Sequence, residues 1–216
     1  MTDPYYSTIL VKRYDPETWW GDLYQENAGF EEMYSRVNEL NPTLVIDAGC
    51  GRNKHKQHIK NLIGIDASPF PEVDIHCPIL EAPFEPECAD AVLVLGSVQF
   101  ISKEYIIENM EKLIRWVKPG GLIEMRVSSQ DDVTKDFIKN YDKQGVKVLW
   151  DNDLRKYFVE KFSLRYIKTP WIYNATAPLD DAWYNQLAKI EKQHVKLKEK
   201  SLRKQDLKKE CWTWIK

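Results

Sequence analysis

Short apolar runs that alternate with helical segments constrain the fold of this chain more than any other feature. The run AVLVL, Ala91–Leu95, is continuously apolar, which is typical of a strand covered on both faces. A segment with helical spacing of its apolar residues follows at Tyr105–Val117. Strands that alternate with helices favour a mainly parallel sheet with helices on both faces, so the pattern predicts an α/β fold.

The same alternation extends over most of the chain. Further strands are predicted at Leu44–Asp47, Leu62–Asp66, Val73–His76, Leu122–Val127, Leu164–Tyr173 and Trp212–Lys216. Further helices are predicted before Asn41-Pro42, at Thr134–Gln144, at Asn152–Phe162 behind an Asp151 cap, and over a long polar segment from Leu179 to Lys209. The 216 residues are enough for one domain with a full core.

We interpret the whole chain as a single domain in four parts. These are a helical N-terminal segment (1–42), a core (43–176), a basic helical insertion (177–209) and a closing strand (210–216). The net charge of −2 gives no global argument for a nucleic-acid partner. The stretch Lys189–Lys209 is locally basic, so it can either contact nucleic acid or remain a solvated helix face.

Cysteine usage and hydropathy bear on the compartment. The four cysteines are scattered and form no C-x-x-C pair, which predicts a reduced, cytoplasmic protein. No apolar run approaches the roughly 20 residues needed to cross a bilayer. We therefore expect no membrane partner.

The stretch LVIDAGCGRNKHKQHIK runs from a strand into two closely spaced glycines, a pattern typical of a turn that brings backbone close to a ligand. A dinucleotide loop needs a third glycine at position 54, which is Lys54 here. The carboxylate of Asp47 would also repel a pyrophosphate at close range. It suits S-adenosylmethionine, which has an ammonium and a sulfonium and no phosphate. Asp66, at the end of the next strand, can either accept hydrogen bonds from a cofactor ribose or cap the turn before Ser68.

Four blocks together carry a family resemblance. The chain resembles class I S-adenosylmethionine-dependent methyltransferases, because four blocks occur in the order found in that family. These blocks are VIDAGCG, GIDAS, EAPFEPECADAVLVLGSVQFI and VKPGGLIEMRV. The resemblance implies a mainly parallel, seven-stranded, doubly wound sheet whose final strand lies antiparallel between the fifth and sixth. It also implies transfer of a methyl group to an O or N acceptor. The compact loop and the Trp-rich end are similar to small methyltransferases encoded by tailed phages.

The resemblance further implies which residues line the cofactor. They are Asp47, Gly49, Cys50 and Gly51 at the methionine part, Asp66 with Ala67 at the ribose, Ile79 and Leu80 at the adenine, and Leu95 and Gly96 beneath the sulfonium. Two positions depart from the family. Asn53 stands where the methyltransferase loop has its third glycine, and Asn tolerates a left-handed turn. Pro78 stands where the family often has an aspartate that accepts from the adenine amino group.

The acceptor side is less specified. Ser97, Gln99 and Glu124 are candidates, and no catalytic base is identified, because the sulfonium is already a good leaving group. His55 and His58 are expected to be a surface pair rather than metal ligands. The alternative function is a non-catalytic module of this fold that acts in an assembly through its basic C-terminal helix. An NAD-dependent oxidoreductase is disfavoured by Asp47 and Lys54.

Overall fold

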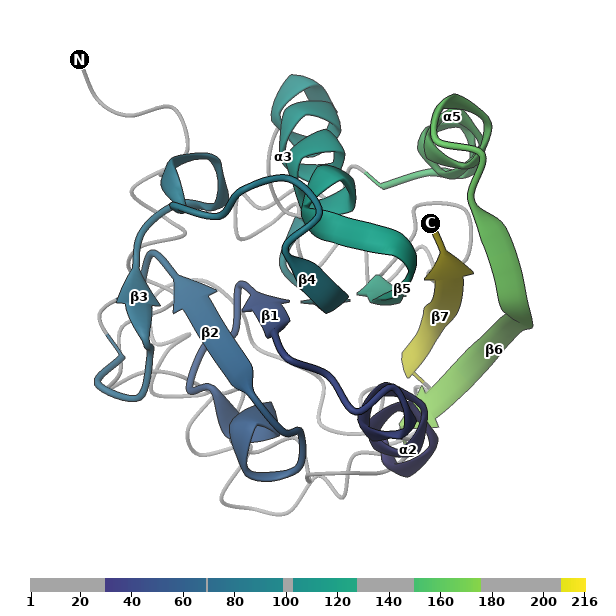
Figure 1. Cartoon of the computed structure of the whole chain (residues 1–216). Helices are drawn as coiled ribbons and strands as arrows, with labels where there is room; N and C mark the ends of the chain where they lie inside the picture. Colours follow the sequence, from purple (N-terminus) through teal and green to yellow (C-terminus); the bar gives the residue numbers. More distant parts are fainter. Residues whose placement is uncertain (1–29, 69, 99–102, 128–149, 176–206) are drawn as a thin grey trace, which may run out of the picture.

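The fold is a single mixed sheet covered by helices (Figure 1). The computed structural model describes residues 30–68, 70–98, 103–127, 150–175 and 207–216. The seven strands of the sheet lie in the order β3-β2-β1-β4-β5-β7-β6. Pairing is parallel from β3 to β5, and β7 is antiparallel to both of its neighbours. The predicted α/β class with a mainly parallel, doubly wound sheet is confirmed.

The elements are bounded as follows. Helices and 3-10 turns are α2 (Glu31–Glu39), η2 (Lys54–Gln57), η3 (Ile79–Glu81), α3 (Lys103–Trp116) and α5 (Asn152–Lys161). Strands are β1 (Val45–Ala48), β2 (Leu62–Asp66), β3 (Ile75–His76), β4 (Ala89–Leu95), β5 (Val117–Val127), β6 (Arg165–Ala175) and β7 (Leu207–Ile215). Asp151 caps α5 as expected, because its side chain accepts from the Leu154 amide. The helices predicted within 1–29, at Thr134–Gln144 and over 179–206 lie outside the described residues.

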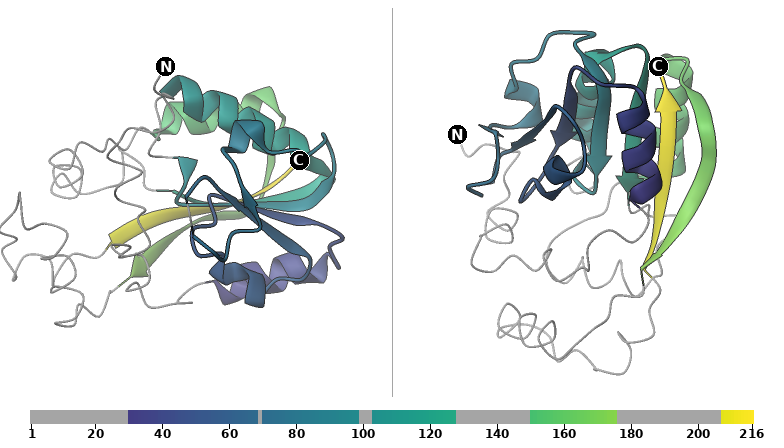
Figure 2. Two further views of the ribbon diagram at one scale, coloured as in Figure 1. Left: turned by 90° about the vertical axis from the view of Figure 1, so that its left-hand side faces the viewer. Right: turned by 60° about the horizontal axis from the view of Figure 1, so that its bottom comes forward.

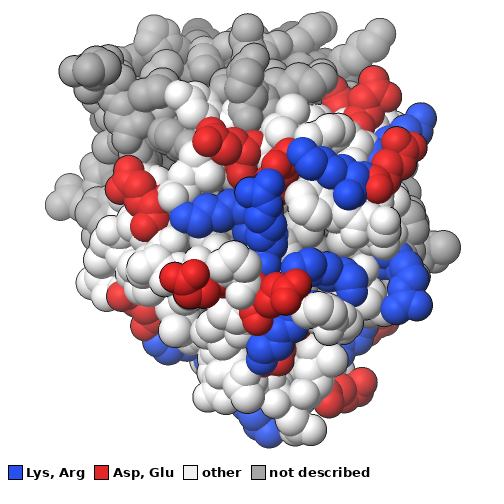
Figure 3. All heavy atoms as spheres, turned by 45° about the horizontal axis from the view of Figure 1, so that its top comes forward, with Lys and Arg blue, Asp and Glu red and all other residues white. Residues whose placement is uncertain are grey.

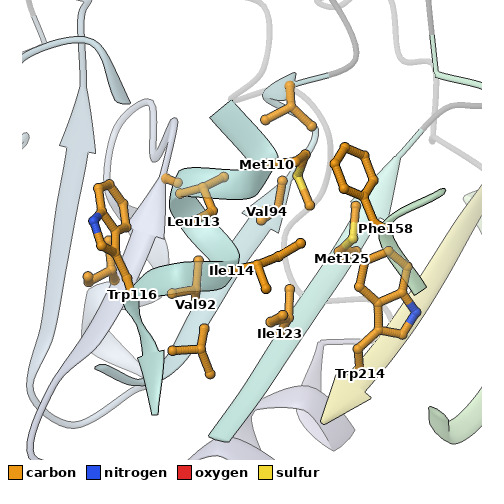
Figure 4. Packing of buried hydrophobic residues seen from close by; sticks show 14 of the residues in the cluster. Val92, Val94, Met110, Leu113, Ile114, Trp116, Ile123, Met125, Phe158 and Trp214 are labelled. Atoms are coloured by element: carbon orange, nitrogen blue, oxygen red, sulfur yellow. The ribbon is translucent and has the colours of Figure 1, made fainter. Parts of the chain in front are cut away.

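Helices cover both faces of the sheet. α3 and α5 lie on one face and α2 lies on the other (Figure 2). On the first face, apolar side chains of β4 and β5 meet α3, α5 and Trp214 (Figure 4). On the second face, Met33 and Val37 of α2 pack against Leu93 and its neighbours. Burial on both faces explains why β4 is a continuous apolar run.

The closing strand lies between β5 and β6, where the resemblance implies it. Trp212, Thr213 and Trp214 are all buried there. The strand begins at Leu207, so the prediction of helix up to Lys209 is wrong for its last three residues. Lys-rich composition suits a solvated helix, but the backbone of 207–210 pairs with β6 residues Ile172–Ala175. Pairing between distant segments decides the conformation here.

Residues 118–121, KPGG, lie within β5 and not before it. The sequence predicts a helix ending at Val117 and a strand beginning at Leu122, but β5 already begins at Val117, which pairs with Ala89. The next pair is Ala91 with Leu122. Residues 118–121 of β5 therefore lie opposite the single residue Asp90 of β4 and form a bulge. Lys118 of the bulge donates to Asp90 at 2.6 Å. The same carboxylate accepts from the Leu44 amide, which fixes the start of β1 against β4.

A buried ion pair joins α2 to the sheet. Arg36 donates to both carboxylate oxygens of Glu124 on β5, at 2.9 and 3.1 Å. Thr213 of β7 donates to the same carboxylate at 2.9 Å. Glu124 is only 3% exposed, so its charge lies in a low-dielectric setting, where the Arg36 guanidinium compensates it. This contact ties three segments of the chain that are far apart in sequence.

Glu124→Ala should lower the free energy of unfolding by about 3–5 kcal/mol, because it leaves the Arg36 guanidinium partly buried without its main partner. Glu32 provides a matched control, since it also pairs with Arg36, at 3.6 Å, but is exposed. Glu32→Ala should cost less than about 1 kcal/mol. Urea unfolding followed by circular dichroism measures both. Equal effects of the two variants would contradict a structural role for the buried pair.

Candidate functional site

The candidate site lies at the carboxyl ends of the central parallel strands. Asp47 precedes the end of β1, Asp66 ends β2, and Leu95 ends β4, which is paired to β1. β1 and β4 are neighbours in the centre of the sheet, and β2 lies on the other side of β1. In open α/β sheets, ligands bind in the crevice outside these strand ends. The fold therefore brings together residues that the sequence assigned separately.

The loop after β1 is bound to β2 through its own backbone. The amides of Gly49 and Cys50 both donate to the Ile65 carbonyl, at 2.8 and 3.1 Å, and the Gly51 amide donates to Asp66 at 2.8 Å. A loop that cradles phosphate instead presents free amides to its ligand. The connection from Gly51 to β2 contains one short helical element, the 3-10 turn η2. Both features fit the short connection between Gly51 and β2, and neither suits a pyrophosphate.

Asn53 has a larger part in this loop than the sequence indicated. Its φ of +52° confirms the predicted left-handed conformation. In addition, its amide nitrogen donates to the Glu72 carbonyl and to Asp74, both at 2.9 Å. Its side chain lies on Gly64 of β2, where an added Cβ would be 2.4 Å from Asn53 Oδ1. Asn53 therefore clamps the loop to the β2–β3 connection, which a glycine cannot do.

Asp74 completes this clamp. Its carboxylate also accepts from the Gly64 amide at 2.9 Å and from Lys56. Partial burial raises the pKa of Asp74, but the hydrogen bonds from Lys56, Gly64 and Asn53 outweigh it and hold that pKa below its ordinary value. Neither Asn53 nor Asp74 was predicted as a clamp, because their contact joins residues 21 positions apart.

Asp47 is the most unusual group of the site. It is 1% exposed, and its Oδ2 has no hydrogen-bond partner among the described residues. Burial, and to a lesser extent the charge of Asp66, raises the pKa of Asp47 to about 7, while Lys54 acts in the opposite direction. A buried carboxylate oxygen without a hydrogen-bond partner is costly for the fold. It would be compensated by a cationic ligand.

A second buried oxygen without a hydrogen-bond partner, Ser97 Oγ, lies next to the loop. Gly49 has a φ of +76°, and a Cβ there would be 2.3 Å from the Ser97 Cβ, so only glycine fits. Within the described part of the chain, the buried Ser97 Oγ makes no hydrogen bond. At Gly96, by contrast, an added Cβ meets nothing within 4 Å. At the ends of β1 and β4, Gly49 thus packs closely on Ser97, and space remains open at Gly96. Two buried oxygens there, Asp47 Oδ2 and Ser97 Oγ, make no hydrogen bond in the described part of the chain.

Asp66 performs the turn-capping role and keeps capacity for more. One carboxylate oxygen accepts from the Ser68 amide at 2.7 Å, and the other accepts from the Gly51 amide. Each oxygen of a carboxylate accepts more than one hydrogen bond. The side chain is half-buried, so it remains accessible to a ligand. Both hypotheses for Asp66 are therefore compatible.

The other predicted residues are placed as follows. Ala67 is exposed after β2, Ile79 and Leu80 are half-buried in η3, and Cys50 is buried in the loop. Burial raises the pKa of the Cys50 thiol, which makes it a poor nucleophile. Cys77 and Cys88 are free and pack against the core. Gln99 lies outside the described residues.

The prediction that His55 and His58 form a surface pair is wrong for His55, which is 5% exposed. It shares a hydrogen bond of 2.9 Å with the Tyr34 hydroxyl and packs edge-on against Phe30. Burial lowers the pKa of His55 to about 3, with smaller contributions from Lys54, Arg126 and His58. His58 stacks on Tyr34. The i, i+3 spacing of the two histidines could not reveal that α2 covers both rings. Among the residues that the structure describes, no cluster of metal-ligating side chains occurs.

Glu124 is not available as an acceptor-side group. Both of its carboxylate oxygens are engaged by Arg36 and Thr213. The hypothesis that it faces the acceptor is replaced by the structural role described above. A single sequence could not distinguish the two, because the pairing partners lie 88 and 89 positions away.

The surface over α3 and α5 carries charges of both signs (Figure 3). Lys161 and Arg115 pair with Glu111, and Lys216 pairs with Glu87. The basic stretch proposed for nucleic acid, Lys189–Lys209, lies outside the described residues up to 206, and Lys208 and Lys209 belong to β7. Of the helices described, none combines the length and apolar character that crossing a membrane requires.

Comparison with known proteins identifies the fold. No family model matches the sequence, and no curated protein matches it either. Among solved structures, the chain is similar to the 1,6-didemethyltoxoflavin-N1-methyltransferase of Burkholderia thailandensis with bound S-adenosylhomocysteine. The TM-score is 0.65 at 14% identity, over 100% of this chain and 91% of that one. The chain has the class I methyltransferase fold.

Two further structures show the range of this fold. The geranyl diphosphate C-methyltransferase of Streptomyces coelicolor A3(2), in complex with S-adenosyl-L-homocysteine, has a TM-score of 0.59 at 14% identity over 99% of this chain and 98% of that one. The [4+2]-cyclase SpnF has a TM-score of 0.57 at 15% identity, over 89% and 85%. The fold thus hosts more than one reaction type, and chemistry has to be argued from the site.

Asn53→Gly tests the clamp. Although glycine accepts the left-handed φ, it removes two hydrogen bonds, so unfolding should become easier by about 1–2 kcal/mol. Asn41 is a matched control, since it is also left-handed, with φ +48°, but is exposed. Asn41→Gly should be neutral or slightly stabilising. Urea denaturation measures both, and a stabilised Asn53→Gly protein would refute the clamp.

Asp47→Asn tests the buried carboxylate. A raised pKa in the folded state means that ionisation opposes folding, so the stability present below pH 4 declines as pH rises through about 7. The amide cannot ionise. Relative to the parent protein, the variant should therefore gain about 2–3 kcal/mol in unfolding free energy between pH 5 and pH 8. Urea unfolding of the ligand-free proteins measures this gain, and a pH-independent difference would contradict the assignment.

Proposed function

We propose that this protein is an S-adenosylmethionine-dependent methyltransferase that transfers a methyl group to an O or N acceptor. The observation that carries the proposal is the buried Asp47 carboxylate, whose Oδ2 has no partner in the described part of the chain. A buried group of this kind indicates a ligand of opposite charge. The ammonium of S-adenosylmethionine is such a group.

The remaining residues of the site fit the rest of this cofactor. Asp66 has the acceptor capacity for the ribose hydroxyls, and Ile79 and Leu80 offer apolar surface to the adenine. The space at Gly96 and the Ser97 hydroxyl border the position where the reaction would occur. When bound, the cofactor would supply a methyl group on a sulfonium, so that attack by the acceptor would break the S–CH3 bond and leave a neutral thioether.

Alignment is the main task left to the protein. Holding an acceptor in line with the methyl group can contribute about 7–11 kcal/mol to lowering the barrier. A general base is required only when the acceptor must lose a proton. Ser97 would orient the acceptor, because its hydroxyl makes no hydrogen bond in the described part of the chain and lies two residues beyond the end of β4.

Isothermal titration with S-adenosylhomocysteine tests the first step. The proposal expects binding with a stoichiometry near one and no binding of NADH. Absence of binding to S-adenosylhomocysteine and S-adenosylmethionine would refute the enzyme and favour the non-catalytic alternative. Transfer itself is tested by incubating cell extract with the protein and methyl-labelled S-adenosylmethionine, then finding the labelled species by mass spectrometry.

Asp66→Ala should weaken binding of S-adenosylhomocysteine about 10- to 100-fold, because charge-assisted hydrogen bonds contribute about 1.5–3 kcal/mol. Asp153→Ala, at an exposed carboxylate on α5, is the matched control and should bind normally. Titration calorimetry measures both. A change of less than threefold at Asp66 would exclude it from the ribose site.

A further inference from the structure

Lys112 of α3 reaches across to the turn η3. Its ammonium donates to the carbonyl oxygens of Leu80 and Ala82, at 2.5 and 3.0 Å. Ala82 is 3% exposed, and Lys112 itself is half-buried. One cation therefore fixes two peptide groups that bracket Glu81. Bonds from a charged donor to a carbonyl are among the stronger hydrogen bonds in proteins.

These two bonds are the main polar attachment of η3 to the fold. Within the turn, the Glu81 and Ala82 amides donate to Pro78 and Ile79. Apart from these internal bonds, the hydrogen bonds that residues 79–82 make in the described part of the chain all come from Lys112. The strand before the turn, β3, has only two residues and lies at the edge of the sheet. The turn therefore depends on α3 for its position.

The lysine is itself held in place. Its ammonium lies 5.5 Å from the centroid of the Trp116 ring, one helical turn along α3. Trp116 is 1% exposed and packs edge-on against Phe84, which follows the turn in sequence. The donor of the two bonds is thus fixed by a buried aromatic contact, and the chain leaving the turn is fixed by the same ring.

We propose that Lys112 is a positioning residue for adenine recognition. This inference rests on the proposed function, in which Ile79 and Leu80 border the adenine. Pro78 lacks the carboxylate that would orient the ring directly, so recognition depends on the shape of the turn. By holding the carbonyls of Leu80 and Ala82 toward α3, Lys112 keeps the side chains of Ile79 and Leu80 in place for the ring. Lys112 itself does not touch the cofactor.

Two ligands separate the proposed role of Lys112 at the adenine part of the cofactor from that of Asp47 at the amino-acid part. S-adenosylhomocysteine carries both the adenosine and the amino-acid part, whereas 5′-methylthioadenosine lacks the ammonium and the carboxylate. Lys112→Met should weaken binding of both ligands by the same factor, tenfold or more. Lys112→Arg, which keeps several donors, should restore most of the affinity. Asp47→Asn should weaken S-adenosylhomocysteine strongly and leave 5′-methylthioadenosine within about threefold, since the affected contact belongs to the amino-acid part.

The matched control is Lys156→Met, at an exposed lysine of α5, which should bind both ligands normally. Titration is done well below the melting temperature of each variant, with near-ultraviolet circular dichroism to confirm folding. Normal binding of both ligands by a folded Lys112→Met protein would overturn the inference and leave the proposed function intact. Failure of the parent protein to bind 5′-methylthioadenosine while binding S-adenosylhomocysteine would overturn it too. Failure to bind either ligand would refute the proposed function itself.

Discussion

The buried carboxylate of Asp47 is the constraint around which the site is arranged. It sits on a central strand of the sheet, where water is excluded and a negative charge is expensive. The shift of its pKa to about 7 corresponds to about 4 kcal/mol at alkaline pH, a large fraction of the stability of a typical domain. A fold tolerates such a cost where a functional site gains from it, and a cationic ligand would offset it.

A second carboxylate on the same face shows the opposite solution. Register places Asp47, Leu93, Glu124 and Thr213 in one row across four strands, so their side chains point to the face covered by α2. Glu124 is as buried as Asp47, but Arg36 and Thr213 satisfy it fully. The two groups share a strand environment and differ in pairing. That difference separates a residue that holds the fold together from one whose Oδ2 makes no hydrogen bond in the described part of the chain.

Sequence reasoning succeeded where neighbouring residues or strand order carry the information. The strands, the left-handed turn at Asn53 and the convergence of Asp47 with Asp66 follow from local pattern and from the geometry of parallel sheets. It failed where contacts between distant segments decide. Burial of His55 under α2, the pairing of Glu124 with Arg36 and the start of β7 at Leu207 depend on packing that a single sequence does not display. Lys112 was missed for the same reason, since its two acceptors precede it by 32 and 30 positions.

The most direct measurement is an NMR titration of the Asp47 carboxyl carbon, with and without S-adenosylhomocysteine. In the ligand-free protein the signal should titrate with a pKa near 7. With ligand bound, the ammonium should stabilise the charged form and lower that pKa by at least two units. A free-protein pKa near 4, or one that the ligand leaves unchanged, would contradict the account.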